Sequence, residues 1–147
     1  MADSLHQIMI HAHEQTIYQA LTQTWGIQAW WTDTCEMARK EGDLCQLWFD
    51  NRQSQFTMKA NKLLPGKRVF WVCLDGPDEW IGTQLWWEIQ EIGENICLLD
   101  FKHMNWSKDD GLFPLCNSTW GSLMQNLKQY CESGNPNPWF RNYKISA

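Results

Sequence analysis

Long apolar runs are missing from this sequence of 147 residues. The longest extends only from Val69 to Leu74, whereas a membrane-spanning helix needs roughly 20 apolar residues. The first residues show neither the basic start nor the apolar block of a secretory signal. The sequence therefore predicts a cytoplasmic protein without a membrane span.

Positive charge is also scarce, with 12 Lys and Arg against 17 Asp and Glu and a formal net charge of −5. Binding to nucleic-acid phosphates requires clustered cations. One local basic cluster, Lys59, Lys62, Lys67 and Arg68, is interleaved with apolar residues, which is typical of the solvated face of a sheet. We therefore expect no nucleic-acid partner.

Familiar catalytic and metal-binding motifs are absent as well. The sequence has no GxSxG, HExxH, P-loop or GxGxxG pattern. Its six cysteines form no CxxC pair, and widely spaced cysteines in a cytoplasmic protein are expected to be reduced thiols. His11 and His13 share one strand face, but two imidazoles are fewer than the ligands of a zinc site. We expect solvent-facing histidines, no metal and no cofactor.

Tryptophan, in contrast, is abundant: there are 11, and aromatic residues make up 14% of the chain. Each large ring can bury roughly 150–250 Å². This surplus of bulky apolar surface is consistent with a ligand cavity, an oligomer interface or a Trp-rich core.

Apolar periodicity predicts an α+β fold. Alternation over residues 5–13 indicates a strand, and helical spacing after Glu14 indicates two short helices divided at Gly26. Further strand patterns lie at residues 44–49, 55–64, 68–74, 83–92 and 96–103. A four-turn apolar stripe then predicts a long C-terminal helix that ends at Gly134. We expect an antiparallel sheet of about six strands to curve around this helix, with a cavity between them.

The chain length allows one domain. We place this domain at residues 1–134 and a C-terminal tail at residues 135–147. The tail contains Trp139, Phe140 and Tyr143, so we expect it to dock on the domain.

Several segments, in order along nearly the whole chain, carry a resemblance to a known family. They are residues 14–22, 26–32, 64–66, 71–73, 76–83, 101–106 and 127–134. As an ordered set they resemble the START-like (SRPBCC) superfamily, in particular its subgroup of homologues of the activator of heat-shock protein ATPase and of polyketide cyclase-like proteins. Where that family commonly has a glycine before a tryptophan, this sequence has Asn105.

This resemblance implies the helix-grip fold, a cavity between the sheet and the C-terminal helix, and binding of an apolar or amphipathic small molecule such as a lipid. It does not imply one reaction, because such proteins include carriers, receptors, cyclases, hydrolases and chaperone regulators.

The residues expected to line the cavity are mostly apolar or aromatic. They are Trp30, Trp31, Phe56, Met58, Trp71, Leu85, Trp87, Phe101, His103, Trp120, Leu123, Met124 and Leu127. His103 is the weak catalytic candidate, as a general base or as an anchor for a ligand carbonyl. Alternatively, it hydrogen-bonds a backbone group or Trp106 and completes the core. Trp30 and Trp31 either flank the cavity entrance or pack the short helices.

Three functions follow as hypotheses. The first is non-catalytic binding of a small hydrophobic or amphipathic molecule in the cavity. The second is a cyclase-like or hydrolytic enzyme that acts on such a ligand, and the third is a co-regulator of a heat-shock chaperone ATPase in the stress response. Trp86 is predicted to point away from the helix, and both faces of residues 68–74 are apolar. A homodimer, the C-terminal tail or a chaperone partner is therefore expected to cover the outer face of the sheet.

Overall fold

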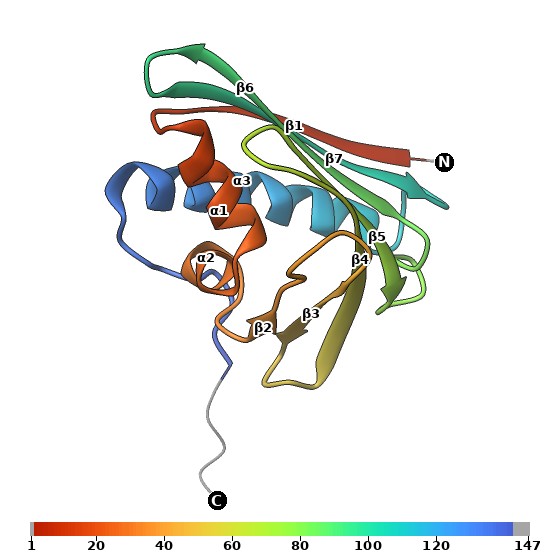
Figure 1. Ribbon diagram of the computed structural model, residues 1–147. Helices are drawn as coiled ribbons and strands as arrows, with labels where there is room; N and C mark the ends of the chain where they lie inside the picture. The colour runs from red at the N-terminus through yellow and green to blue at the C-terminus, as the bar shows by residue number, and fades with distance from the viewer. Residues whose placement is uncertain (1, 143–147) are drawn as a thin grey trace, which may run out of the picture.

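Seven antiparallel strands form one curved sheet in the computed structural model, which describes residues 2–142 (Figure 1). The strands are β1 (Ala2–Ile10), β2 (Cys35–Glu36), β3 (Leu44–Phe49), β4 (Ser54–Leu64), β5 (Arg68–Asp75), β6 (Gln84–Gly93) and β7 (Ile96–Trp106). Their order across the sheet is β1-β7-β6-β5-β4-β3-β2. The helices are α1 (Glu14–Thr22), α2 (Thr24–Trp30) and α3 (Phe113–Ser133). The predicted α+β helix-grip fold is confirmed, with β2 as an additional strand.

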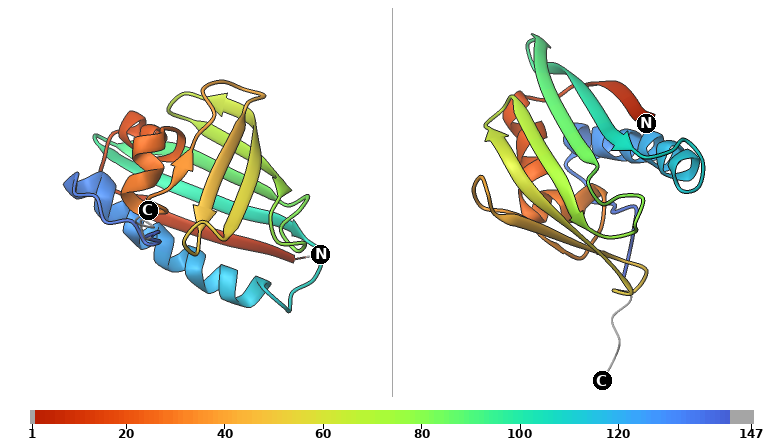
Figure 2. Two further views of the ribbon diagram at one scale, coloured as in Figure 1. Left: turned by 90° about the horizontal axis from the view of Figure 1, so that it is seen from below. Right: turned by 90° about the vertical axis from the view of Figure 1, so that its right-hand side faces the viewer.

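The core lies between the concave face of the sheet and α3, which runs along that face (Figure 2). The inward-facing residues alternate along the longer strands, as the sequence predicts. On the neighbouring strands β6 and β7 they are Leu85, Trp87, Ile89, Cys97, Leu99, Phe101 and His103. The facing stripe of α3 contains Trp120, Leu123, Met124 and Leu127. Full burial of one large apolar side chain contributes roughly 1.5–3 kcal/mol. Burial of the inward-facing strand residues against the apolar stripe of α3 therefore stabilises the packing of this helix on the sheet.

Gly26 lies inside α2 and does not separate the two short helices. The break falls at Gln23, whose extended backbone closes α1 and opens α2. A Cβ atom on residue 26 would lie 2.7 Å from the Cα of Ala20 in α1, a distance that backbone atoms cannot accommodate. The sequence-based prediction was wrong here because this glycine permits close helix packing.

Asn105 adopts a left-handed backbone conformation, with φ of 68°. Asparagine tolerates this conformation better than most residues, whereas glycine adopts it without a steric penalty. The backbone N–H of Asn105 donates to Asp3 Oδ1 at 3.1 Å. Asn105 lies within β7, where the register with β1 shifts between Ala2 and Ser4. The chain thus makes, with asparagine, a bulge of the kind for which glycine is suited.

The chain after α3 returns along α2. The backbone N–H of Asn137 donates to the carbonyl of Ala29 at 2.8 Å, and that of Phe140 to the carbonyl of Trp31 at 2.8 Å. Asn126 of α3 donates through Nδ2 to the carbonyls of Trp30 and Asn137, both at 2.7 Å. These bonds join α2, α3 and the segment that follows α3. Tyr143 lies outside the described residues.

The outer face of the sheet carries a stacked aromatic pair. Phe70 of β5 and Trp86 of β6 lie with ring centroids 3.9 Å apart and an interplanar angle of 21°. Both rings are half-buried, and Trp86 points away from α3 as predicted. Among residues 2–142, none of the helices combines the length and apolar content that crossing a membrane requires.

Candidate functional site

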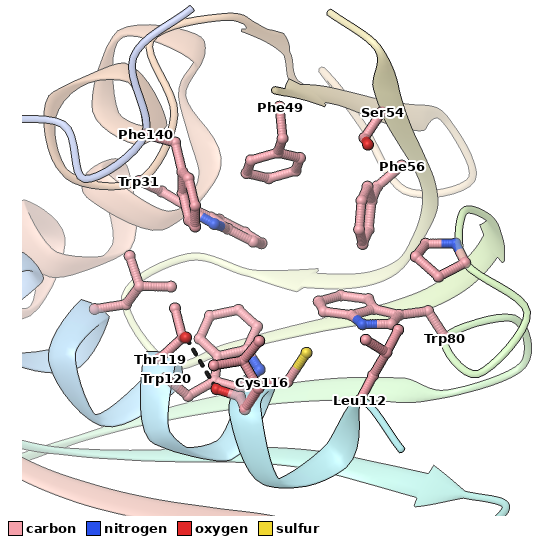
Figure 3. Close-up of a pocket in the computed structure, with 13 residues that line it drawn as sticks. Trp31, Phe49, Ser54, Phe56, Trp80, Leu112, Cys116, Thr119, Trp120 and Phe140 are labelled. Atoms are coloured by element: carbon pink, nitrogen blue, oxygen red, sulfur yellow. Dashed lines mark hydrogen bonds between the residues drawn. The ribbon is translucent and has the colours of Figure 1, made fainter. Parts of the chain in front are cut away.

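An apolar pocket of about 340 Å³ opens beside the N-terminal half of α3 (Figure 3). Its walls come from the end of α2, from β3 and β4, from the loop between β5 and β6, from α3 and from the segment after α3. The lining residues are Trp31, Phe49, Ser54, Phe56, Pro77, Trp80, Leu112, Leu115, Cys116, Thr119, Trp120, Leu123 and Phe140. This volume is near the lower end of the roughly 300–1,000 Å³ typical of small-molecule sites.

Aromatic rings from five different parts of the chain close a circuit around the pocket. We call this circuit the aromatic collar: Trp31, Phe49, Phe56, Trp80 and Trp120. Successive ring centroids lie 5.9, 5.0, 4.7, 6.2 and 5.0 Å apart around the closed loop. Such spacings are within the range of favourable aromatic pairs. Phe140 extends the collar, with its ring 5.1 Å from that of Phe49.

The polar groups of the pocket are few and uncharged. The Thr119 hydroxyl donates to the carbonyl of Leu115 at 2.9 Å, so it can only accept a hydrogen bond from a ligand. Burial raises the pKa of the Cys116 thiol, while a hydrogen bond with Trp80 lowers it. Among the described residues, no Asp, Glu, Lys or Arg lines the pocket. The site therefore suits a neutral molecule, because an unpaired charge would be costly in it.

The structure divides the predicted cavity residues into two groups. Trp31, Phe56, Trp120 and Leu123 line the pocket. The others lie in the core away from its walls: Trp30, Met58, Trp71, Leu85, Trp87, Phe101, His103, Met124 and Leu127. The large rings explain the division, since Trp30, Trp71, Trp87 and Phe101 fill the middle of the space between sheet and helix. The cavity is therefore displaced toward one end.

The two adjacent tryptophans Trp30 and Trp31 have different roles. Trp30 is fully buried, and its Nε1 donates to the carbonyl of Ala20 at 2.8 Å, which ties α2 to α1. Trp31 stacks beside it, with centroids 5.6 Å apart, and forms a wall of the pocket. Of the two readings of the sequence, core packing holds for Trp30 and a pocket position for Trp31.

His103 is enclosed beneath the pocket and forms part of a hydrogen-bond chain. The indole N–H of Trp120 donates to Nδ1 of His103 at 3.1 Å, and Nε2 of His103 lies 2.8 Å from Oγ1 of Thr83. Because Nδ1 accepts, the proton of the neutral ring resides on Nε2, which donates to Thr83. The Thr83 hydroxyl donates onward to the carbonyl of Trp80 at 2.6 Å.

Burial lowers the pKa of His103 to about 3. A neutral imidazole with both nitrogens engaged, and with no exposed surface, has neither a free lone pair nor solvent access for acid–base work. Its chain connects Trp80 and Trp120, two members of the aromatic collar. This geometry favours the core-completing alternative for His103, although with Thr83 and Trp120 as partners in place of Trp106.

The sequence reasoning missed several pocket residues: Phe49, Ser54, Pro77, Trp80, Leu112, Leu115, Cys116, Thr119 and Phe140. Phe49 ends β3, where alternation gives little information about direction. Trp80 lies in a polar loop, and its place in the collar follows from the inward turn of that loop. For Cys116 and Thr119, the helical spacing with Trp120 and Leu123 was an available signal.

Within the described part of the chain, His11, His13 and the cysteines show no arrangement typical of a metal site or a disulfide. His13 accepts from the backbone N–H of Gln15 through Nδ1 at 3.1 Å and caps α1, and His11 faces Glu132 at 3.3 Å. Within residues 2–142, no group of three or more potential metal ligands comes together. All six cysteines fall within the described residues and are free thiols.

Comparison with known proteins places this geometry in context. No protein-family model matches the sequence, and no curated protein matches it. The structure is similar to that of the Aha1 dimer from Colwellia psychrerythraea, with 30% sequence identity and a TM-score of 0.83 over 91% of this chain and 98% of that one. That similarity extends over the whole fold.

Two further solved structures share the fold at lower identity. DynU16, from the dynemicin biosynthetic locus, has 15% identity and a TM-score of 0.77 over 95% of this chain and 51% of its own. CalU16 from Micromonospora echinospora has 15% identity and a TM-score of 0.72 over 92% of this chain and 77% of its own.

Proposed function

Because the chain belongs to the Aha1-like branch of the START-like (SRPBCC) superfamily, in which one fold serves several functions, we propose from the site that it binds a small, neutral, hydrophobic or amphipathic molecule in the pocket beside α3. The pocket that the aromatic collar surrounds is the observation that carries this proposal. Its uncharged lining supports binding over turnover, and the enclosed position of His103 weakens the enzymatic alternative.

The expected affinity follows from the area that such a ligand buries. At about 0.8 kcal/mol per methylene, a six-carbon apolar portion contributes roughly 5 kcal/mol, which corresponds to a sub-millimolar Kd. Aromatic contacts and a hydrogen bond would tighten this value. The predicted cytoplasmic location and the division into a domain over 1–134 and a docked tail over 135–147 are part of the same proposal.

Filling the pocket tests the proposal directly. Thr119 is half-buried on α3 and lines the pocket, whereas its neighbour Ser118 is exposed and does not. Thr119→Phe adds a ring inside the cavity, and Ser118→Phe adds the same ring outside it. In a thermal-shift and tryptophan-fluorescence screen of neutral hydrophobic compounds, the wild type and Ser118→Phe should respond alike.

Thr119→Phe should lose at least about tenfold in affinity for every compound that binds, because the added ring occupies the volume the ligand needs. Equal binding by Thr119→Phe and Ser118→Phe would place the ligand elsewhere. Binding of no compound to the wild type would remove the proposal.

A protein-partner role is the second candidate, and the stacked pair of Phe70 and Trp86 favours it. Half-buried aromatic rings on an open sheet face are typical anchors of protein interfaces. The partner would be a second copy of this chain or a heat-shock chaperone ATPase. Trp86→Ser should weaken such a complex at least about tenfold, as measured by analytical ultracentrifugation or pull-down with the purified chaperone.

Trp25 provides the matched control, since it is 52% exposed on α2, far along the chain from β5 and β6. Trp25→Ser should leave the complex unchanged. A complex that is insensitive to Trp86→Ser would exclude the outer sheet face as its interface.

A further inference from the structure

Two features of the pocket narrow the chemistry of its occupant: a hydrogen-bond donor without a partner and the shape of the aromatic collar. Trp31 is only 2% exposed and lines the pocket. Figure 3 shows its indole reaching into the cavity from beside Phe140. Among residues 2–142, no acceptor takes a hydrogen bond from its Nε1. The Trp31 Nε1 atom is also absent from the fully enclosed indole nitrogens without a partner, which in the described part of the chain are those of Trp87 and Trp106, so it keeps accessible surface. An accessible indole N–H that no described residue engages can donate to an oxygen of a ligand in the pocket.

The other collar indoles are already engaged. Trp120 donates to His103 at 3.1 Å, and Trp80 shares a hydrogen bond with the Cys116 thiol. Two more indole nitrogens, those of Trp87 and Trp106, are enclosed without partners, but neither residue lines the pocket. Trp31 is thus the collar indole that combines an unused donor with access to the cavity.

The collar also favours a flat aromatic body. Neighbouring rings meet at steep angles, 74° for Phe49 and Phe56 and 90° for Phe56 and Trp80. Rings set at such angles to one another can offer both faces and edges to a ligand between them. A planar aromatic ligand can match these with stacked and edge-to-face contacts, whereas a saturated one gains only burial.

We propose that the pocket selects neutral, planar aromatic molecules that carry a hydrogen-bond-accepting oxygen, and that Trp31 Nε1–H is the donor that fixes this oxygen. This inference rests on the proposed function, since it specifies the ligand of the same pocket. Trp31 is then a specificity-determining residue, and the carbonyl of an aryl ketone is the simplest acceptor that fits.

Three related compounds separate the contribution of the hydrogen bond from that of the planar aromatic rings. 2-Acetylnaphthalene has the planar rings and the acceptor, 2-ethylnaphthalene has the rings alone, and 2-acetyldecalin has the acceptor on a saturated, non-planar skeleton. Each is titrated into the full-length protein by calorimetry or fluorescence. We expect 2-acetylnaphthalene to bind about fivefold more tightly than 2-acetyldecalin, because only the former makes aromatic pairs with the collar.

The ratio of the acetyl to the ethyl affinity isolates the hydrogen bond, because differences in ring burial cancel when wild type and variant are compared. Trp31→Phe keeps an aromatic ring and removes the N–H. The ratio should fall about fivefold to tenfold in Trp31→Phe and remain unchanged in Trp25→Phe, the control on the surface of α2.

A measurement on the wild type covers the case in which Trp31→Phe does not fold. In ¹⁵N-labelled protein, 2-acetylnaphthalene should move the Trp31 Nε1–H proton resonance downfield, and 2-ethylnaphthalene should not.

Each alternative outcome is diagnostic. If the acetyl preference survives Trp31→Phe but disappears in Ser54→Ala, the donor is the Ser54 hydroxyl and the assignment to Trp31 is overturned. If all three compounds bind equally and the Trp31 resonance does not respond, the inferred ligand class is wrong while the proposed binding function stands. If none binds and other neutral hydrophobic compounds also fail, both are overturned.

Discussion

At the scale of one residue, His103 has a side chain that could act in catalysis but lies in the core as a hydrogen-bonded structural group. The sequence places a titratable ring at the end of an apolar strand row, which is compatible with catalysis or with the core. The structure gives both of its nitrogens a neutral partner, Trp120 and Thr83. Sequence periodicity can predict that His103 faces inward, but it cannot predict which distant side chains meet it there.

The lowered pKa of His103 makes protein stability depend on pH. In the unfolded chain the pKa is about 6.5, and in the folded protein it is about 3. Between these values the unfolded chain binds the extra proton, so the free energy of unfolding decreases as the pH falls from about 6.5 toward 3. The slope contributed by this one group is at most about 1.4 kcal/mol per pH unit. Above about pH 6.5 the ring is neutral in both the folded and the unfolded chain, so the free energy of unfolding no longer depends on its titration.

His103→Gln should flatten this dependence, because glutamine does not titrate. Urea unfolding at several values between pH 7 and pH 4 measures the slope in both proteins. The carboxyl groups of Asp33 and Glu132, whose pKa values hydrogen bonds lower, contribute equally to both proteins. The difference between the two slopes therefore reports His103, and parallel slopes would show that its ring takes up a proton in the folded state.

Secondary-structure elements were predictable where periodicity is strong. The strands from Leu44 to Trp106 and the helix α3 occur close to their predicted ranges. Two failures have physical causes. β2 has two residues, too few for an alternating pattern, and Gly26 serves helix packing where helix termination was expected. Pocket residues on loops and strand ends include Trp80 and Phe49. The direction of their side chains depends on the path of the chain outside regular elements, which local sequence patterns do not encode.

Two glycines within helices should respond in opposite ways to alanine. Gly26→Ala places a Cβ 2.7 Å from the Cα of Ala20 and should lower the free energy of unfolding by roughly 1–3 kcal/mol. Gly121→Ala in α3 meets nothing closer than His6 Cε1 at 3.8 Å and should raise it by roughly 0.5–1 kcal/mol. Urea unfolding measures both, and a neutral effect of Gly26→Ala would contradict the close helix contact.

At the scale of the whole molecule, the aromatic residues have two roles in the space between the sheet and α3. In the middle, between the sheet and α3, the rings pack against one another and fill the core. Toward the N-terminal half of α3, the rings spread into the collar and leave the pocket open. The fold class followed from the sequence and its resemblance. The position of the cavity depended on how much volume the tryptophans fill.

The location of a bound ligand is the central claim, and intermolecular nuclear Overhauser effects test it most directly. With 2-acetylnaphthalene bound to ¹³C,¹⁵N-labelled protein, we predict contacts to the ring protons of Trp31 and Phe56 and to the methyl group of Thr119. Contacts confined to Phe70 and Trp86 on the outer face of the sheet would contradict the assignment of the pocket as the binding site.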